Sequence, residues 1–261
     1  MELGPDIIAL LMAAAFMAGT IDAIAGGGGL LTIPALLAAG LPPVAAIATN
    51  KVQSSFGTGG AVLAFARKGH IDLRRFALPA VASFLGSAFG AWVLTRIDPK
   101  VLAGLIPVLL IVMVAYYIFS PKMTDQDRHV LAGPALLFVF CALVGWYDGF
   151  FGPGTGSFFI TGLVAVFGFG LTRAVAHTKL LNFASNLAGL AVLVVGGHAV
   201  WVVGLAMAVG SMAGGQVGAH LAIRFGTKAV RPLLIVMCLG LTAKLLADPA
   251  NPLTALVLRW F

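Results

Sequence analysis

The sequence predicts an all-α protein that crosses a membrane many times and carries a duplicated core. Of its 261 residues, 60% are hydrophobic and only 10% are charged, whereas a soluble domain carries about 25% charged residues. The duplication is visible at Asp22 and Asp148, because each is followed six residues later by a glycine of a glycine-rich run, 26–29 and 152–156. An apolar chain that repeats itself in this way is typical of polytopic membrane proteins with internal repeats.

Apolar runs long enough to cross a bilayer occur eight times. A helix needs about 20 apolar residues to span the hydrocarbon core. The predicted spans are 6–25, 43–66, 74–95, 100–119, 130–151, 171–195, 199–223 and 229–247. Two shorter runs, 30–41 and 156–169, follow the glycine-rich breaks and are expected to be half-helices or short spans, which gives 8–10 crossings. A last run, 252–261, is expected to lie at the interface.

The repeat can be followed along the chain by a nearly constant offset. At the two aspartates it is 126 residues, and further on it becomes 128, from Lys51 to Lys179 and from Arg96 to Arg224. The hydrophilic stretch 120–129 falls between the copies. We therefore predict a first transmembrane repeat over 1–119, a connector over 120–129 and a second repeat over 130–261.

The basic residues predict the orientation of the chain. One short loop carries four of them, and the equivalent loop around His198 carries none; the four are Arg67, Lys68, Arg74 and Arg75. Because the basic loop changes place between the copies, the second copy is expected to be inverted relative to the first. The excess of Lys and Arg on the cytoplasmic side then places 67–75, 120–129 and 224–231 in the cytoplasm and both termini outside.

Composition also excludes several classes of function. The formal net charge is +7, but the positive residues lie in short loops between apolar runs, so nucleic acid is not an expected partner. Cys141 and Cys238 both lie inside apolar runs, and neither a disulfide nor a metal site is expected. The run 26–29 lacks the Lys-Ser/Thr ending of a phosphate loop. We expect no cofactor, and residues 6–25 are interpreted as a retained span.

The glycine-rich breaks are the first candidate for a binding site. Backbone N–H groups exposed by a broken helix are tolerated in a membrane only where protein or a water-filled cavity covers them. A helix that restarts after such a break directs its free N–H groups and its positive end at an anion. Gly27, Gly28, Gly154 and Thr155 are the candidate residues. The alternative is that the glycines only allow close helix packing.

The buried lysines are the second candidate. Lys51 and Lys179 each lie several residues inside a long span, and a lysine at the centre of a spanning helix costs about 2.5–3.5 kcal/mol. A bound anion would offset that cost, and polar neighbours predict a wet pocket: Thr49, Asn50, Gln53, Ser54, Thr178 and Asn182. The alternative is a structural ion pair with Asp22 or Asp148. If the lysine serves the anion, Lys51→Ala should abolish flux and leave folding intact.

Asp22 and Asp148 each remain open to two interpretations, and His177 is a candidate for substrate choice. The aspartates either cap the broken helices and pair with the lysines, or one of them titrates and carries a proton across the membrane. His177 stands where the first copy has Thr49, and such a difference between copies is one mark of substrate choice.

Gly86 with Gly90, and the equivalent Gly214 with Gly218, have the spacing of closely packed membrane helices.

At these residues the chain resembles the TauE/SafE family of sulfite and organosulfonate exporters, also called the 4-toluene sulfonate uptake permease family. The resemblance covers essentially the whole chain and rests on four segments: 19–29, 49–55, 145–156 and 178–186. It implies a bacterial inner-membrane carrier of sulfite, sulfonates or related small anions. Neither the substrate nor the direction of transport carries over, because members of the family differ in both.

The expected function is a secondary transporter that works by alternating access, with export favoured and proton coupling left open. The expected partners are a small anionic substrate and the lipid bilayer, and the protein is expected to be a monomer or a homodimer. The alternatives are a passive small-anion channel and an importer of another small anion. No nucleophile–base set is visible, so we do not expect an enzyme.

Overall fold

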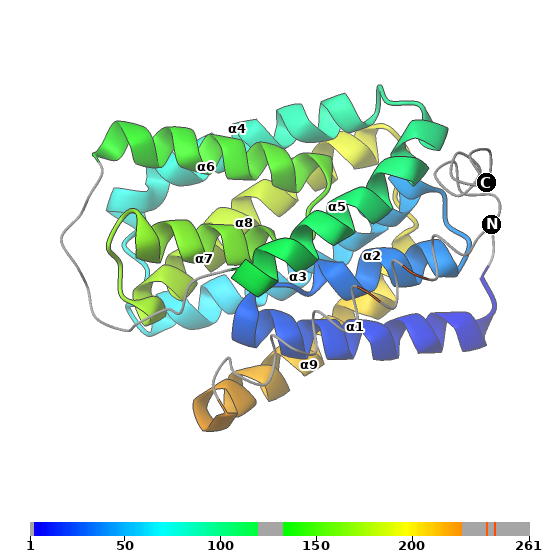
Figure 1. Ribbon diagram of the computed structural model, residues 1–261. Helices are drawn as coiled ribbons and strands as arrows, with labels where there is room; N and C mark the ends of the chain where they lie inside the picture. Colours follow the sequence, from blue (N-terminus) through cyan, green and yellow to red (C-terminus); the bar gives the residue numbers. More distant parts are fainter. Residues whose placement is uncertain (1–2, 120–132, 226–238, 240–242, 244–261) are drawn as a thin grey trace.

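The computed structural model describes residues 3–119, 133–225, 239 and 243. In the two long described stretches the chain forms nine α-helices and no strand, which confirms the prediction of an all-α fold there (Figure 1). The predicted runs 229–247 and 252–261 fall almost wholly outside the described residues. The helices are α1 Pro5–Ala25, α2 Gly29–Ala38, α3 Pro43–Arg67, α4 Leu73–Leu94, α5 Pro99–Phe119, α6 Pro134–Phe150, α7 Thr155–Ala165, α8 Leu171–Val195 and α9 Trp201–Phe225.

The helix ends follow from proline and glycine. Proline occupies the first turn of α1, α3 and α6, where its missing N–H removes no helical hydrogen bond. Helix α1 ends at Gly26, whose φ of 75° lies in the left-handed region that favours glycine. Helix α7 begins after Gly154, with a φ of 83°. The glycine-rich runs therefore break the chain into separate helices, and α2 and α7 are only 10 and 11 residues long.

Hydropathy supports a membrane location for this bundle. Among the described residues, α1, α4, α8 and α9 are long and apolar enough to cross a membrane. Helix α3 is as long as α8, at 25 residues, but its middle carries a run of polar side chains from Thr49 to Thr58. In a membrane such residues must face the protein interior, and most of this run is buried.

Helices from one half of the chain pack against helices from the other half. Helix α1 lies along α9 and α4 lies along α6, while α3 and α8 are in contact with each other. The close contacts are made at the predicted glycines: a Cβ on Gly214 would overlap the carbonyl oxygen of Phe16, and one on Gly90 would overlap that of Trp146. This confirms the prediction of close packing at these positions.

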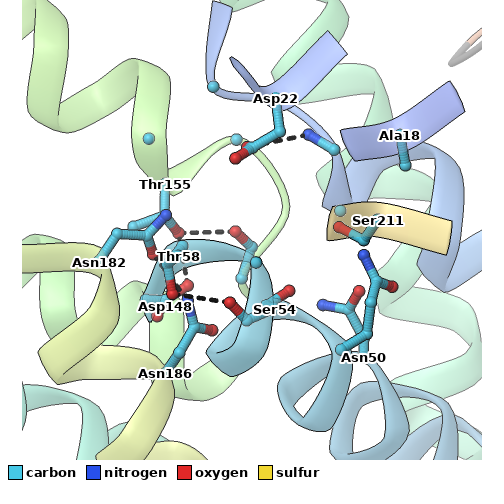
Figure 2. Close-up of a pocket in the computed structure, with 18 residues that line it drawn as sticks. Ala18, Asp22, Asn50, Ser54, Thr58, Asp148, Thr155, Asn182, Asn186 and Ser211 are labelled. Carbon is cyan, nitrogen blue, oxygen red and sulfur yellow. Dashed lines mark hydrogen bonds between the residues drawn. The ribbon is translucent and has the colours of Figure 1, made fainter. Parts of the chain in front are cut away.

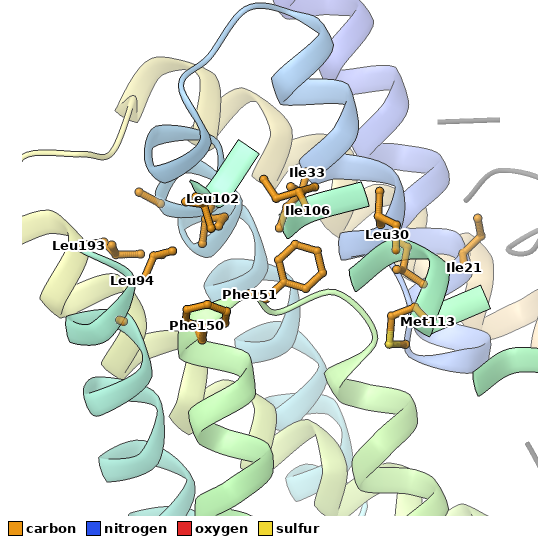
Figure 3. Packing of buried hydrophobic residues seen from close by; sticks show 14 residues of the cluster. Ile21, Leu30, Ile33, Leu94, Leu102, Ile106, Met113, Phe150, Phe151 and Leu193 are labelled. Carbon is orange, nitrogen blue, oxygen red and sulfur yellow. The ribbon is translucent and has the colours of Figure 1, made fainter. Parts of the chain in front are cut away.

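An apolar cluster holds the two glycine breaks in place (Figure 3). Helix α5 contributes Leu102, Ile106 and Met113, which pack against the start of α2 and the end of α6. The Met113 side chain lies directly against Gly154, where any Cβ would overlap it. Because the cluster contacts both breaks at once, it fixes their positions relative to each other.

Candidate functional site

The two glycine breaks meet near the centre of the bundle. The backbone N–H and the hydroxyl of Ser157, in the first turn of α7, donate to the carbonyl oxygen of Gly26 over 3.1 and 3.0 Å. A Cβ on Gly29 would lie 3.2 Å from Cα of Pro153. The glycine-rich segments that lead into α2 and α7 therefore lie side by side, although they are more than 120 residues apart in the sequence.

A cavity of about 40 Å³ lies at this junction (Figure 2). It has room for a few water molecules or one small ion. Its wall is polar and comes from both halves of the chain. The lining includes Asn50, Gln53, Ser54, Gly57 and Thr58 of α3, Asn182 and Asn186 of α8, Ser211 of α9, and Asp22, Gly28, Asp148, Gly154 and Thr155 at the breaks. We call this cavity the central pocket.

Two ion pairs flank the central pocket, and each joins one half of the chain to the other. Lys51 Nζ lies 2.8 Å from Asp148 Oδ2, and Lys179 Nζ lies 2.8 Å from Asp22 Oδ2. The two pairs are equivalent under the offsets of the repeat. Lys51 also donates to Asn186 Oδ1 over 3.1 Å. The buried ammonium groups are thus satisfied by carboxylate and amide oxygens, as buried charges must be.

The two ion pairs differ in exposure. The side chains of Lys51 and Asp148 are 1% and 3% exposed, whereas Lys179 is 4% and Asp22 is 30% exposed. The aspartates line the central pocket, and the two lysine side chains are not part of its wall. With both residues of each pair ionised, the pocket and its flanking pairs together carry no net charge.

Hydrogen bonds hold most of the lining side chains in fixed positions. The Thr155 hydroxyl donates to Asp148 Oδ1 over 2.9 Å, and Thr32 donates to Asn50 Oδ1 over 2.6 Å. Asn186 Nδ2 donates to Asn182 Oδ1 over 3.1 Å. Gln53 Oε1 is buried and finds no donor among the described residues. An unsatisfied buried oxygen is costly, so a water or a ligand that carries a donor would stabilise this site.

Several predicted site residues lie outside the wall of the central pocket: Lys51, Lys179, Gly27, Thr49, Thr178 and His177. Thr49 and His177 make equivalent contacts instead. The N–H of Asp72 donates to His177 Nε2 over 3.1 Å, and the N–H of Val200 donates to the Thr49 hydroxyl over 3.1 Å. Thr49 of α3 therefore accepts from the connection after α8, and His177 of α8 accepts from the connection after α3. Because both side chains act as acceptors, Thr and His can replace each other at these equivalent positions.

The other contacts of His177 also hold neighbouring parts of the fold together. Its ring stacks on Phe76 with the centroids 3.8 Å apart, and Nδ1 lies 2.8 Å from the carbonyl oxygen of Arg173. These contacts occupy both ring nitrogens and one face of the ring. The structure thus gives His177 a role in joining α8 to the start of α4, outside the wall of the central pocket.

The lining includes residues that the sequence argument did not select. Thr58 and Ser211 lie in the wall of the pocket, together with Ala18 and Gly57. Thr58 could have been found through the repeat, because it stands 128 residues before Asn186. No comparable signal marks Ser211, whose position depends on the packing of α9 against α1 and α3. Among the described residues no group of His, Cys, Asp and Glu could hold a metal ion.

Comparison with known proteins agrees with this architecture. The family model described as sulfite exporter TauE/SafE matches residues 11–245. The chain belongs to the TauE/SafE family. This TauE/SafE protein is 45% identical over 256 residues to the "Probable membrane transporter protein ORF9" of Sinorhizobium sp, with 97% of each chain covered. It is therefore a membrane transporter of this family and a multi-pass protein of the bacterial inner membrane.

Further relatives carry similar descriptions. A "Probable membrane transporter protein" of Haemophilus influenzae is 41% identical over 249 residues, covering 95% of this chain and 98% of the relative. The "Probable membrane transporter protein YfcA" of Escherichia coli K12 is 40% identical over 245 residues, covering 94% and 91%. No solved structure matches this TauE/SafE protein.

Proposed function

We propose that this TauE/SafE protein is a secondary transporter that moves sulfite, organosulfonates or related small anions across the inner membrane by alternating access, in the direction of export. The observation that carries the proposal is the central pocket, which lies where two broken helices meet and takes its polar wall from both halves of the chain. Substrate sites of secondary transporters are built in this way, from discontinuous helices at the interface of the repeats. The family description supplies the class of anion.

The proposal includes two repeats of inverted topology, 1–119 and 130–261, joined by 120–129. In Figure 1, α3 ends at the end of the molecule at which α8 begins, and α9 ends toward the same end of the molecule as that at which α4 begins. The contacts of His177 and Thr49 support this arrangement, because each joins the start of one of these helices to the connection after the other. The two ion pairs, each between a lysine of one half and an aspartate of the other, fit the same symmetry.

The charges suggest how an anion is accommodated. The ion pairs leave the central pocket without net charge while Asp22 and Asp148 are ionised, and an anion added there would face two carboxylates. Protonation of one aspartate would release its lysine and give the site a single positive charge. The anion would then replace the carboxylate as the partner of the lysine. Coupling of anion and proton movement follows from this exchange.

The remaining roles in the proposal follow from the lining. Lys51 and Lys179 supply the positive charge once their aspartates are neutralised. The Gly154 N–H and the side chains of Asn50, Gln53, Ser54 and Asn182 would hydrogen-bond the oxygens of a sulfite or sulfonate group. The Gly28 N–H and the Thr155 hydroxyl, which donate to Asp22 Oδ1 and Asp148 Oδ1, would join them when the anion replaces a carboxylate. Rocking of the two repeats about the pocket would expose it to each side in turn.

Transport by purified protein in liposomes tests this function. Sulfite, small alkylsulfonates, carboxylates and inorganic cations would be added in turn while current and internal pH are recorded. We expect a saturable response to sulfite or a sulfonate that is accompanied by a change of internal pH. Folded protein that responds to none of the sulfur oxyanions would overturn the proposed substrate class. A current that does not saturate and moves no protons would instead establish the passive anion channel.

A further inference from the structure

A second cavity lies beside the central pocket, between α1, α3 and α9. Its volume is about 340 Å³. The two cavities share Asp22, Gly57 and Ser211 in their walls, so they are adjacent at these three residues. From there the second cavity extends past Ala61 and Ala64 to Lys68, at the C-terminal end of α3. We call it the α3–α9 cavity.

The equivalent place in the other half of the chain is tightly closed. There α4 packs against α8 and α6. The Ser83 hydroxyl donates to the carbonyl oxygen of Leu181 over 3.0 Å, and the Ser87 hydroxyl donates to that of Ser185 over 2.6 Å. Both serines are fully buried. A Cβ on Gly149 would overlap the Ser87 carbonyl oxygen, and in the other half a Cβ on Gly19 would overlap that of Ser211. The α6–α4 and α1–α9 contacts are therefore equally close, and the two halves differ at the contacts of α4 with α8 and of α9 with α3.

The α3–α9 contact lacks the two serine hydrogen bonds, although it is built from equivalent positions. Ser211 corresponds to Ser83, but its hydroxyl makes no hydrogen bond to any described residue. Gly215 corresponds to Ser87 and has no hydroxyl to donate. The nearest atom to a Cβ placed on Gly215 is the Gly19 carbonyl oxygen, at 4.0 Å. We call these two equivalent contacts the α4–α8 seam and the α3–α9 seam. The α4–α8 seam is therefore closed, and the α3–α9 seam is open.

The exposure of the ion pairs follows this difference. Asp22 and Lys179 both line the α3–α9 cavity, and the Asp22 side chain is 30% exposed. The equivalent Asp148, behind the closed α4–α8 seam, is 3% exposed. Two pairs with the same Nζ–Oδ2 distance thus differ in exposure because one of the two seams is open.

We infer that the α3–α9 cavity is the route by which the ligand reaches the central pocket from the side of Lys68, and that the α4–α8 seam is the corresponding gate in its closed form. This inference rests on the proposed function, since a route requires something to be carried. Because Lys68 is one of the four basic residues of the loop 67–75, the route opens toward the cytoplasm. Asp22 and Lys179 form the ion pair that the arriving ligand meets first.

Cysteine accessibility at matched positions tests the route. In a background with Cys141 and Cys238 replaced by alanine, two positions in the α3–α9 cavity are compared with their equivalents in the other half. The pairs are Gly215→Cys with Ser87→Cys, and Ala64→Cys with Val192→Cys. A membrane-impermeant methanethiosulfonate reagent that carries a sulfonate group is applied from the cytoplasmic side in inverted vesicles, and from the outside in spheroplasts.

We expect Gly215→Cys and Ala64→Cys to lose their free thiols from the cytoplasmic side, while Ser87→Cys and Val192→Cys keep theirs. Equal reactivity within both pairs, or reaction of Ser87→Cys and Val192→Cys alone, would overturn the route. Two pairs are used so that a single variant that fails to fold, judged by size-exclusion chromatography, does not decide the result.

The labelling does not depend on transport, so the two proposals can fail separately. Labelling as expected in protein that moves no anion would leave the cytoplasmic opening of the α3–α9 cavity standing and remove the anion-carrier function. Saturable anion flux combined with equal labelling within each pair would leave the function standing and remove the route.

Discussion

At the scale of single residues, the buried lysines decide how the site is interpreted. The sequence left two explanations for Lys51 and Lys179, a bound anion or a structural ion pair, because residue type alone does not show what offsets a buried charge. The structure pairs each lysine with an aspartate of the other half. The two explanations are now steps of one proposed cycle, in which an anion takes the place of a carboxylate after that carboxylate is protonated.

This pairing changes the expected result of Lys51→Ala. The sequence argument expected intact folding, but removing the lysine leaves Asp148 buried and unpaired, which costs about 3–5 kcal/mol. We predict a markedly lower apparent Tm for Lys51→Ala in detergent. The double variant Lys51→Met/Asp148→Asn, which removes both charges, should recover most of the loss. An unchanged Tm for Lys51→Ala would show that the pair does not hold the fold together.

His177 offers a test of substrate choice against structure. Its contacts match those of Thr49 at the equivalent position, so His177→Thr should keep the acceptor for the Asp72 N–H. We predict that this variant retains wild-type KM values and the wild-type order of anion preference. His177→Ala serves as the comparison and should lower the apparent Tm, because the N–H then lacks its partner. A changed order of anion preference in His177→Thr would restore the role in substrate choice.

At the scale of helices, the glycines control how closely the two halves approach. Gly90 and its equivalent Gly218 contact the backbone of α6 and α1 so closely that a Cβ would overlap a carbonyl oxygen. We predict that Gly90→Ala or Gly218→Ala lowers stability by about 1–3 kcal/mol, the usual effect of overpacking. Gly60→Ala is the control, since nothing lies within 4 Å of a Cβ there and alanine favours the helix. Equal Tm values for all three variants would contradict this packing.

The positions of the helices were predictable from the sequence, but their partners were not. Apolar runs and glycine breaks gave the boundaries of α1 to α9 to within a few residues, because proline and glycine set local conformation directly. An internal offset shows which residues are equivalent and says nothing about which ones touch. The packing of α1 against α9, and with it the place of Ser211 in the pocket, depends on contacts between distant segments.

At the scale of the whole molecule, the proposed inversion of the second repeat makes a prediction about sidedness. Arg96 and Arg224 are equivalent positions at the ends of equivalent helices. In the cysteine-free background, Arg96→Cys should react with an impermeant thiol reagent from outside the cell, and Arg224→Cys only from the cytoplasm. Reaction of both from the same side would contradict the inversion and, with it, the symmetry on which the two gates depend.

The pocket residues were predictable in part for the same reason that the fold was. Asn50, Ser54 and Asn182 follow from the spacing of polar residues on a helix, since one face must turn inward in a membrane. The sequence identifies Lys51 and Lys179 as costly buried charges. It does not identify their exact aspartate partners, because each ion pair joins one half of the chain to the other. The unequal opening of the two seams has one trace in the sequence, Gly215 in place of the equivalent Ser87. Ser83 and Ser211 are the same residue type, so the difference between their contacts required the structure.

The most direct test of the central claim is counterflow of a small alkylsulfonate in liposomes that contain the wild-type protein. Because a sulfonate stays charged, leakage across the lipid is slow and movement reports the protein. We predict that unlabelled sulfonate on one side accelerates the movement of labelled sulfonate from the other, and that Lys51→Met/Asp148→Asn abolishes this exchange in folded protein. A labelled flux that does not change when unlabelled sulfonate is added on the opposite side would contradict an alternating-access carrier. Full exchange in the double variant would contradict a transport site at the meeting of the two halves.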